Sequence, residues 1–167
     1  SVVVADAGPL IALGRLNHLD VLPQLFADVQ VTATVLAECL AQPERPDAQR
    51  IAAAVSVGQI HRFPDTERVE VGPLGPGESS AVARAREIGA GLLMDDRAAV
   101  THARAIGLKV IGTLGVLVLA KRNGLLEEIS PLVRQMRDGG YYLGEARAPA
   151  SPEASADSCG NATTPPP

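Results

Sequence analysis

The sequence of 167 residues has no tryptophan, and aromatic residues make up only 2% of it. Its core must therefore be built from Leu, Val, Ile and Ala. The two cysteines, Cys39 and Cys159, do not follow a metal-ligand spacing and give no ground for a disulfide. Neither a signal peptide nor an apolar run long enough to span a bilayer is evident. We therefore expect a cytoplasmic protein with no contact to a membrane.

A strong excess of charge is missing too. The formal net charge is −4, with 20% charged and 46% hydrophobic residues, which is ordinary for a soluble globular domain. These values exclude a polycation that binds nucleic acid by bulk charge alone. If nucleic acid is the substrate, the positive charge must be local or come from metal ions. The length predicts one domain with a sizeable core.

Short apolar runs alternate with segments of helical spacing along most of the chain. Strands are predicted at residues 2–5, 28–32, 59–63, 90–94 and 108–111. Helical spacing is found at residues 9–13, 16–26, 35–40, 47–57, 78–88, 98–106, 113–122 and 127–137. This alternation predicts an α/β fold, a three-layer α/β/α sandwich around a central parallel sheet.

The composition changes near residue 145. Residues 145–167 are rich in Ala, Ser, Pro and Thr with almost no apolar bulk, which predicts a disordered tail. We therefore expect a folded domain over residues 1–144 and a tail over 145–167. Residues 64–71 are expected to form a loop or a second short strand, and residues 141–143 an edge strand or a segment packed on the body.

Acidic residues occur where solubility does not require them. Asp6 directly follows the buried strand 2–5, and Asp95 and Asp96 directly follow the strand at 90–94. Glu38 lies among apolar neighbours on a helix, and Glu78 begins a helix behind a Gly- and Pro-rich loop. The carboxyl ends of parallel strands form one edge, where open α/β sheets bind ligands. We therefore expect these carboxylates to converge there.

Clustered carboxylates raise one another's pKa in a low dielectric, and a divalent cation removes that penalty. A site made of oxygen atoms alone suits the hard ions Mg²⁺ and Mn²⁺. Such an ion activates water and neutralises the charge that builds on a phosphate. The acidic set therefore predicts phosphodiester hydrolysis.

Each acidic residue also has a structural explanation. Asp6 can cap the helix that follows it, Glu78 is favourable at any helix N-terminus, and Glu38 can pair with an arginine. One residue of the pair Asp95–Asp96 is expected to cap the next helix. We favour Asp96 as the metal ligand, with Asp95 nearby.

Three basic residues are candidates for binding the substrate. Arg97 directly follows the acidic pair, and Lys121 and Arg122 end a predicted helix. A solvated surface charge is the alternative for each, and the helix dipole alone explains a basic pair at a C-terminus. The sequence has neither a phosphate-binding loop nor a Ser/His/Asp pattern.

Several stretches together resemble a known family. They are Val-Ala-Asp-Ala-Gly-Pro-Leu-Ile at 4–11, Val-Leu-Ala-Glu at 35–38, Gly-Pro-Gly-Glu at 75–78, Leu-Met-Asp-Asp-Arg-Ala-Ala at 93–99 and Val-Ile-Gly-Thr-Leu-Gly-Val-Leu at 110–117. They resemble PIN domains, above all the DUF3368 group of predicted nucleases of bacteria and archaea. The resemblance covers residues 2–144.

PIN domains are metal-dependent ribonucleases, often the toxins of VapBC-type toxin–antitoxin pairs. The resemblance implies that Asp6, Glu38, Glu78 and Asp96 form the acidic quartet, with Mg²⁺ or Mn²⁺ as cofactor. It also implies an RNA substrate, a small antitoxin as partner and a homodimer. Gly8 departs from the pattern, because many PIN domains carry Ser or Thr there.

The sequence thus predicts a metal-dependent endoribonuclease that cuts single-stranded RNA, the toxin of a toxin–antitoxin pair. One alternative is a PIN-like module that binds RNA or a partner protein without cutting. Another is a phosphoacceptor domain of the receiver type, which needs an acidic pair after its first strand and a lysine after its last. Here the acidic pair follows a late strand and Lys109 opens one, which disfavours that class. The apolar helical segments 16–26 and 48–57 are candidates for a dimer surface.

Overall fold

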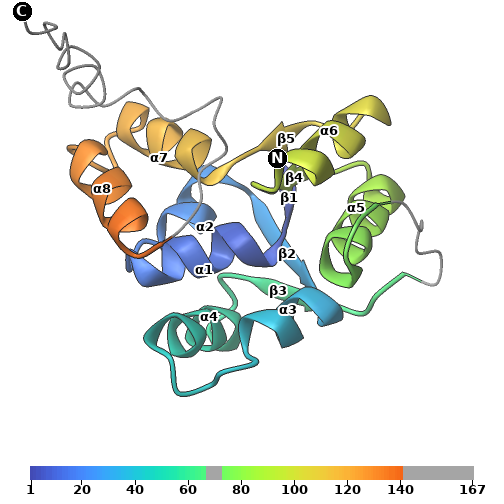
Figure 1. Ribbon diagram of the computed structural model, residues 1–167, viewed down its shortest axis with the longest axis horizontal. Helices are drawn as coiled ribbons and strands as arrows, with labels where there is room; N and C mark the ends of the chain where they lie inside the picture. The colour runs from blue at the N-terminus through green and yellow to red at the C-terminus, as the bar shows by residue number, and fades with distance from the viewer. Residues whose placement is uncertain (67–72, 141–167) are drawn as a thin grey trace, which may run out of the picture.

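Five parallel strands form a single sheet in the computed structural model, which describes residues 1–66 and 73–140 (Figure 1). The strands are β1 (Val2–Ala5), β2 (Asp28–Thr32), β3 (His61–Phe63), β4 (Gly91–Leu93) and β5 (Val110–Ile111). Their order in the sheet is β3-β2-β1-β4-β5, and every neighbouring pair is parallel. The predicted parallel sheet is therefore confirmed.

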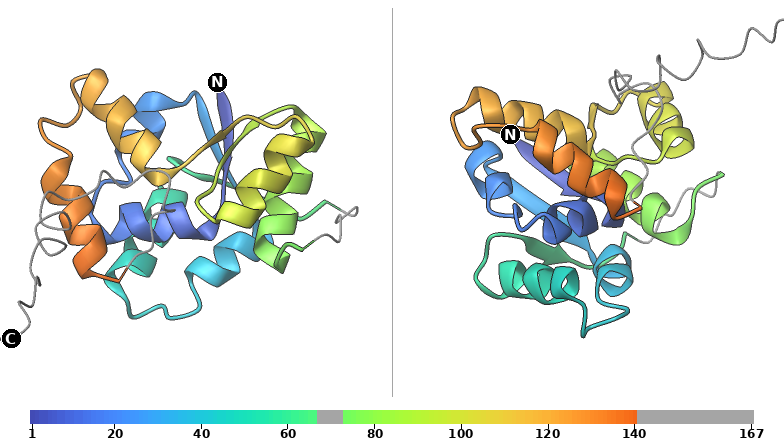
Figure 2. Two further views of the ribbon diagram at one scale, coloured as in Figure 1. Left: turned by 45° about the horizontal axis from the view of Figure 1, so that its top comes forward. Right: turned by 60° about the vertical axis from the view of Figure 1, so that its left-hand side comes forward.

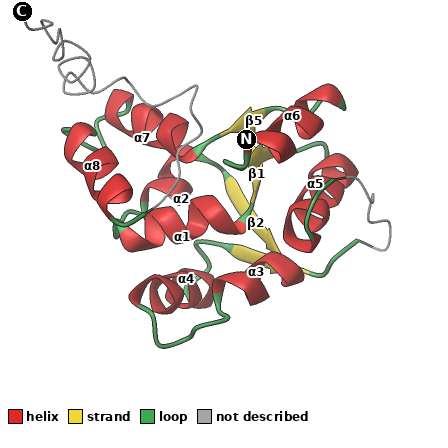
Figure 3. Ribbon diagram, in the orientation of Figure 1, coloured by secondary structure: helices red, strands yellow, loops and turns green. Residues whose placement is uncertain are grey.

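Helices cover both faces of this sheet (Figures 1 and 3). They are α1 (Ala7–Arg15), α2 (Val21–Leu25), α3 (Ala33–Cys39), α4 (Pro46–Ser56), α5 (Pro76–Ile88), α6 (Arg97–Ala105), α7 (Thr113–Arg122) and α8 (Ser130–Asp138). Helices α5 and α6 lie on one side of the sheet, and α1, α2 and α7 lie on the other, with α8 next to α7 (Figure 2). This is the expected three-layer α/β/α sandwich.

The core is aliphatic, as the shortage of aromatic residues predicts. Strand β1 runs through the middle of the sheet, and Val3, Val4 and Ala5 are at most 2% exposed. Leu92 and Leu93 of the neighbouring β4 are completely buried. Such strands, buried on both faces, place the residue that follows them at the edge of the core. Asp6 follows β1 directly, so the centre of the sheet carries a carboxylate at its carboxyl end.

Two helical expectations need correction. Residues 16–26 are not one helix, because α1 ends at Arg15 and Asn17 adopts the left-handed conformation with φ 57°, which asparagine tolerates better than most residues. Only the short α2 follows. The last helix begins at Ser130 rather than near residue 127, with Pro131 in its first turn, where proline is favourable.

Some expectations fall outside the described residues. Residues 64–66 have no regular structure, and 67–72 are not described. The expected edge segment at 141–143, the tail at 145–167 and the domain boundary between residues 144 and 145 also lie beyond the described part. None of the helices in residues 1–66 and 73–140 has the length and apolarity that crossing a membrane requires.

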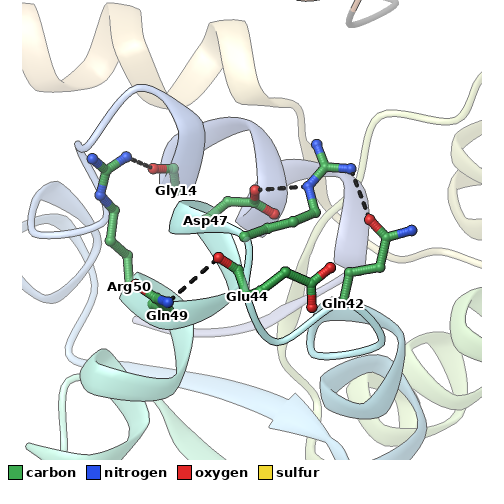
Figure 4. A network of polar contacts seen from close by, with 7 residues as sticks. Gly14, Gln42, Glu44, Asp47, Gln49 and Arg50 are labelled. Atoms are coloured by element: carbon green, nitrogen blue, oxygen red, sulfur yellow. Dashed lines mark hydrogen bonds and ion pairs between the residues drawn. The ribbon is translucent and has the colours of Figure 1, made fainter.

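Helix α4 packs closely against α1, and a polar network surrounds the contact (Figure 4). Arg50 donates to the backbone oxygen of Gly14 at 2.7 Å. A Cβ at Gly14 would lie 3.2 Å from that of the buried Asp47, so glycine allows the close approach. Asp47 also accepts from the Nε of Arg45 at 3.4 Å.

The apolar residues that suggested a dimer surface are used inside the chain. Ala48, Ile51 and Ala54 of α4 are at most 5% exposed, and Leu19 and Leu22 are similarly buried. Val57 at the end of α4 is 70% exposed. Part of both segments is therefore used inside the fold, and a dimer surface on the exposed remainder stays a prediction.

We predict that Leu92→Ala lowers the free energy of unfolding by about 2–5 kcal/mol, because it leaves a cavity in the central layer. Val57→Ala is the control and should change it by less than ~0.5 kcal/mol, because that side chain is exposed. Urea denaturation followed by circular dichroism measures both. Equal losses in the two variants would contradict the assignment of the core.

Candidate active site

A pocket of about 450 Å³ lies at the carboxyl end of the sheet. The residues that line it come from the ends of β1 and β4 with the starts of α1 and α6 that follow them, from α3 and from the start of α5. They are Asp6, Ala7, Gly8, Glu38, Gly75, Gly77, Glu78, Asp95, Asp96 and Arg97. All five carboxylates singled out in the sequence therefore share one pocket.

Asp6 is the most buried of these carboxylates. Its backbone N–H donates to the oxygen of Leu93 at 2.8 Å, which ties the end of β1 to β4, and the residue is 7% exposed. It precedes α1, but its side chain makes no capping hydrogen bond. Helix capping therefore does not explain why a carboxylate stands here.

The pKa of Asp6 is raised to about 7, and burial is the largest cause. A hydrogen bond from the backbone N–H of Ala7 lowers this pKa, while the charges of Glu78, Glu38 and Asp95 contribute smaller increases, in that order. The charges of three other pocket residues thus act on Asp6 from three different elements. Repulsion of this kind is what a cation in the pocket would relieve.

Glu38 faces the first turn of α5. Burial raises the pKa of Glu38, a hydrogen bond from the backbone of Gly77 lowers it, and the charge of Glu78 raises it. A Cβ placed on Gly77 would lie 2.6 Å from Oε1 of Glu38 and 2.7 Å from its Cδ, closer than such atoms approach. Gly77 therefore leaves the space that the Glu38 carboxylate occupies.

Glu78 lies in the first turn of the same helix. Its Oε2 accepts a hydrogen bond from the backbone N–H of Gly75 at 3.1 Å. The structural explanation for Glu78, a favourable place at a helix N-terminus, is therefore correct. Because it also lines the pocket and raises the pKa of both Asp6 and Glu38, the same residue belongs to the acidic set.

The adjacent aspartates cap two different helices. Asp96 is the N-cap of α6 and accepts from the backbone N–H of Ala99 at 2.9 Å. Asp95 reaches the start of α7, where its oxygens accept from the N–H of Thr113 at 2.8 Å and from the Thr113 hydroxyl at 2.5 Å. Of the two, Asp95 is the one whose charge raises the pKa of Asp6, whereas the sequence favoured Asp96 as the ligand beside it.

Thr113 is a site residue that the sequence analysis missed. It is completely buried and fixes both oxygens of Asp95. The sequence does contain a signal for Thr113: it is a hydroxyl residue at the start of a predicted helix that follows a strand. Hydroxyl residues at such positions often cap the helix. Its partner lies 18 residues away in the sequence, and no local pattern indicates which carboxylate it meets.

The donor set fits a hard divalent cation in its chemistry. Four further carboxylates line the pocket together with Asp6, and Mg²⁺ and Mn²⁺ prefer oxygen ligands. Within residues 1–66 and 73–140, however, no group of three or more His, Cys, Asp or Glu side chains is arranged to hold a metal ion.

The three basic candidates do not lie together. Arg97 lines the pocket, but Lys121 and Arg122 do not. Helix α7 begins beside Asp95 and leads away from it, so Lys121 lies about 12 Å further along the helix axis. There it pairs with Glu128 at 3.7 Å. Lys121 and Arg122 therefore lie outside this pocket, and their role in binding the substrate stays a prediction.

Comparison with known proteins identifies a family and solved structures of similar fold. A family model described as a PIN domain, DUF3368, matches residues 2–150. A PilT N-terminus domain protein of the hyperthermophilic archaeon Sulfolobus solfataricus shares 19% identity, with a TM-score of 0.49, over 77% of this chain and 96% of that one. A domain of functionally unknown role from Methanocaldococcus jannaschii shares 20% identity, with a TM-score of 0.47, over 66% and 89%. The curated proteins contain no match.

We predict that Asp6→Asn stabilises the protein at pH 8 in buffer with a chelator. Ionisation of Asp6 disfavours the folded state, because the pKa is about 7 there and 3.8 ordinarily, so stability falls as the pH rises through this range. The difference corresponds to at most about 4 kcal/mol. Asparagine does not ionise, and Asp6→Asn should therefore gain ~1–4 kcal/mol at pH 8 and much less at pH 4.

Urea denaturation at the two pH values measures this effect. Asp20→Asn is the matched control, since Asp20 is exposed and outside this pocket, and it should change the unfolding free energy by less than ~0.5 kcal/mol. A loss of stability in Asp6→Asn that is equal at both pH values would contradict the repulsion described here.

Proposed function

Because the chain belongs to the PIN-domain family DUF3368, whose members are generally nucleases, we propose that it is a divalent-metal-dependent endoribonuclease. Its substrate would be single-stranded RNA, and the reaction hydrolysis of a phosphodiester bond. The observation that carries this proposal is Asp6, a buried carboxylate that caps no helix and meets the charges of three further carboxylates in one pocket.

Each pocket residue has a role in this proposal. Asp6, Glu38, Glu78 and Asp96 form the acidic quartet, and Asp95 supplies further negative charge. A bound Mg²⁺ or Mn²⁺ supplies the positive charge and the activated water that attack on a phosphodiester requires. In the reaction, a water oxygen bonds to phosphorus while one bridging P–O bond breaks and the released oxygen takes up a proton.

Arg97 is the proposed contact to the substrate. It begins α6 directly after the acidic pair and lines the pocket. A guanidinium group binds phosphate oxygens through paired N–H donors. Beside five carboxylates it also lowers the repulsion that an incoming phosphate meets.

The biological context is proposed from the family resemblance. We propose that the protein acts in the cytoplasm as the toxin of a toxin–antitoxin pair, with a small antitoxin protein as partner and a homodimer as its assembly. A neighbouring reading frame for a small protein, whose co-expression relieves growth arrest and suppresses RNA cleavage, supports this context. Unchanged growth when the protein is expressed alone argues for a housekeeping nuclease.

A PIN-like module that binds RNA or a partner protein without cutting is the second candidate. Two observations favour it: Gly8 brings no hydroxyl to the pocket, and four of the carboxylates are already bonded to backbone N–H groups. RNA binding that persists in Mn²⁺ without any cleavage would support this candidate over the nuclease.

We predict that the purified protein cuts single-stranded RNA in Mn²⁺ or Mg²⁺ and that EDTA abolishes the cleavage. Asp6→Asn and Asp96→Asn should each lower the rate by more than ~100-fold, since even residues that only support metal ligands typically cost 10–100-fold. Fluorescent RNA substrates give the rates, and Asp20→Asn serves as the control with unchanged activity. Cleavage that survives EDTA, or that is equal in Asp6→Asn and the wild type, would contradict the proposed function.

A further inference from the structure

Two buried hydroxyl groups join the two helices that carry the pocket glutamates. Thr32 is completely buried and Ser80 is 2% exposed, and their side-chain oxygens lie 2.7 Å apart. Thr32 ends β2 and caps α3, the helix of Glu38. Ser80 lies near the start of α5, the helix that begins with Gly77 and Glu78 in its first turn.

The direction of the hydrogen bonds follows from counting protons. The Ser80 hydroxyl donates its single proton to the backbone oxygen of Gly77 at 2.8 Å, so it must accept from Thr32. The Thr32 oxygen in turn accepts from the backbone N–H of Val35 at 3.3 Å. A continuous chain of three hydrogen bonds therefore runs from the first turn of α3 to the first turn of α5.

The chain ends on the residue against which Glu38 lies. The backbone of Gly77 donates a hydrogen bond to the Glu38 carboxylate, and its missing Cβ leaves the space for that carboxylate. Ser80 holds the carbonyl group of the same residue. The first turn of α5 is therefore fixed from both sides, by Ser80 and by Glu38.

We propose that Thr32 and Ser80 are positioning residues that hold the first turn of α5 against α3, so that Gly77, Glu38 and Glu78 meet at the acidic pocket. Neither hydroxyl lines the pocket, and both act through the backbone of Gly77. This inference rests on the proposed function, because it assigns the link a role in metal binding and cleavage. If the link were purely structural, its loss would change the stability of the protein but leave metal binding and RNA cleavage unchanged.

The experiment compares Ser80→Ala with Ser79→Ala. Ser79 is 4% exposed, precedes Ser80 in the same helix and takes no part in the hydroxyl link. In Ser80→Ala the affinity for Mn²⁺, measured by calorimetry without RNA, should fall ~10-fold, within the range for residues that orient metal ligands. The kcat for RNA cleavage should fall by a similar factor, with KM unchanged. Ser79→Ala should match the wild type in Mn²⁺ affinity, kcat and KM.

A second pair of variants tests the other end of the link and does not depend on Ser80→Ala being folded. Thr32→Ser keeps the hydroxyl and should retain the affinity for Mn²⁺. Thr32→Val has nearly the same shape without the hydroxyl and should lose affinity to the same extent as Ser80→Ala.

The outcomes separate the inference from the function on which it rests. If the wild type binds Mn²⁺ and cuts RNA, and the variants without a hydroxyl do so equally well, only the positioning role is overturned. If the wild type neither binds Mn²⁺ nor cuts RNA, the proposed function is contradicted and the positioning role falls with it.

Discussion

Repulsion between carboxylates in one pocket is the constraint on which this structure depends. A parallel sheet ends all its strands at one edge, and here β1 and β4 are each followed at that edge by acidic residues. The same topology begins helices there, and their first turns present unpaired N–H groups. The fold therefore brings together negative side chains and the positive ends of helices. The helix ends partly compensate the negative charge of the carboxylates.

The helix ends relieve this repulsion only in part. Glu38, Glu78, Asp95 and Asp96 each accept a backbone N–H from the start of α5, α6 or α7 or from the residue before α5. Such a hydrogen bond stabilises one carboxylate but does not remove the repulsion between that carboxylate and its neighbours. Asp6 lies where these charges meet, and its pKa is raised by burial first and by the charges of Glu78, Glu38 and Asp95 in addition. A cation acts on several carboxylates at once, which single N–H groups do not.

The sequence predicts those parts of the structure that depend on local pattern. The parallel sheet follows from apolar runs such as 2–5 and 90–94, and the pocket follows from acidic residues placed directly after them. The break at Asn17 was missed because apolar spacing continues across it while the backbone turns. Lys121 ends a helix as predicted, but the spacing of a helix does not reveal in which direction the helix leads from the pocket. The partners of Thr113 and Ser80 are distant in sequence, so only the folded chain identifies them.

Structural and functional explanations of an acidic residue do not exclude one another in this pocket. From the sequence, one of Asp95 and Asp96 is expected to cap a helix and the other to bind a metal ion, yet both cap helices and both line the pocket. A carboxylate has about four lone-pair sites, so an oxygen that accepts one N–H still has the capacity to accept a metal ion or a water. The cap also fixes the rotamer of the carboxylate, which lowers the entropy lost when a ligand binds. A capped carboxylate at this edge is therefore better prepared to act as a ligand than a free one, whereas the N–H of Ala7 offsets only part of the rise in the pKa of Asp6.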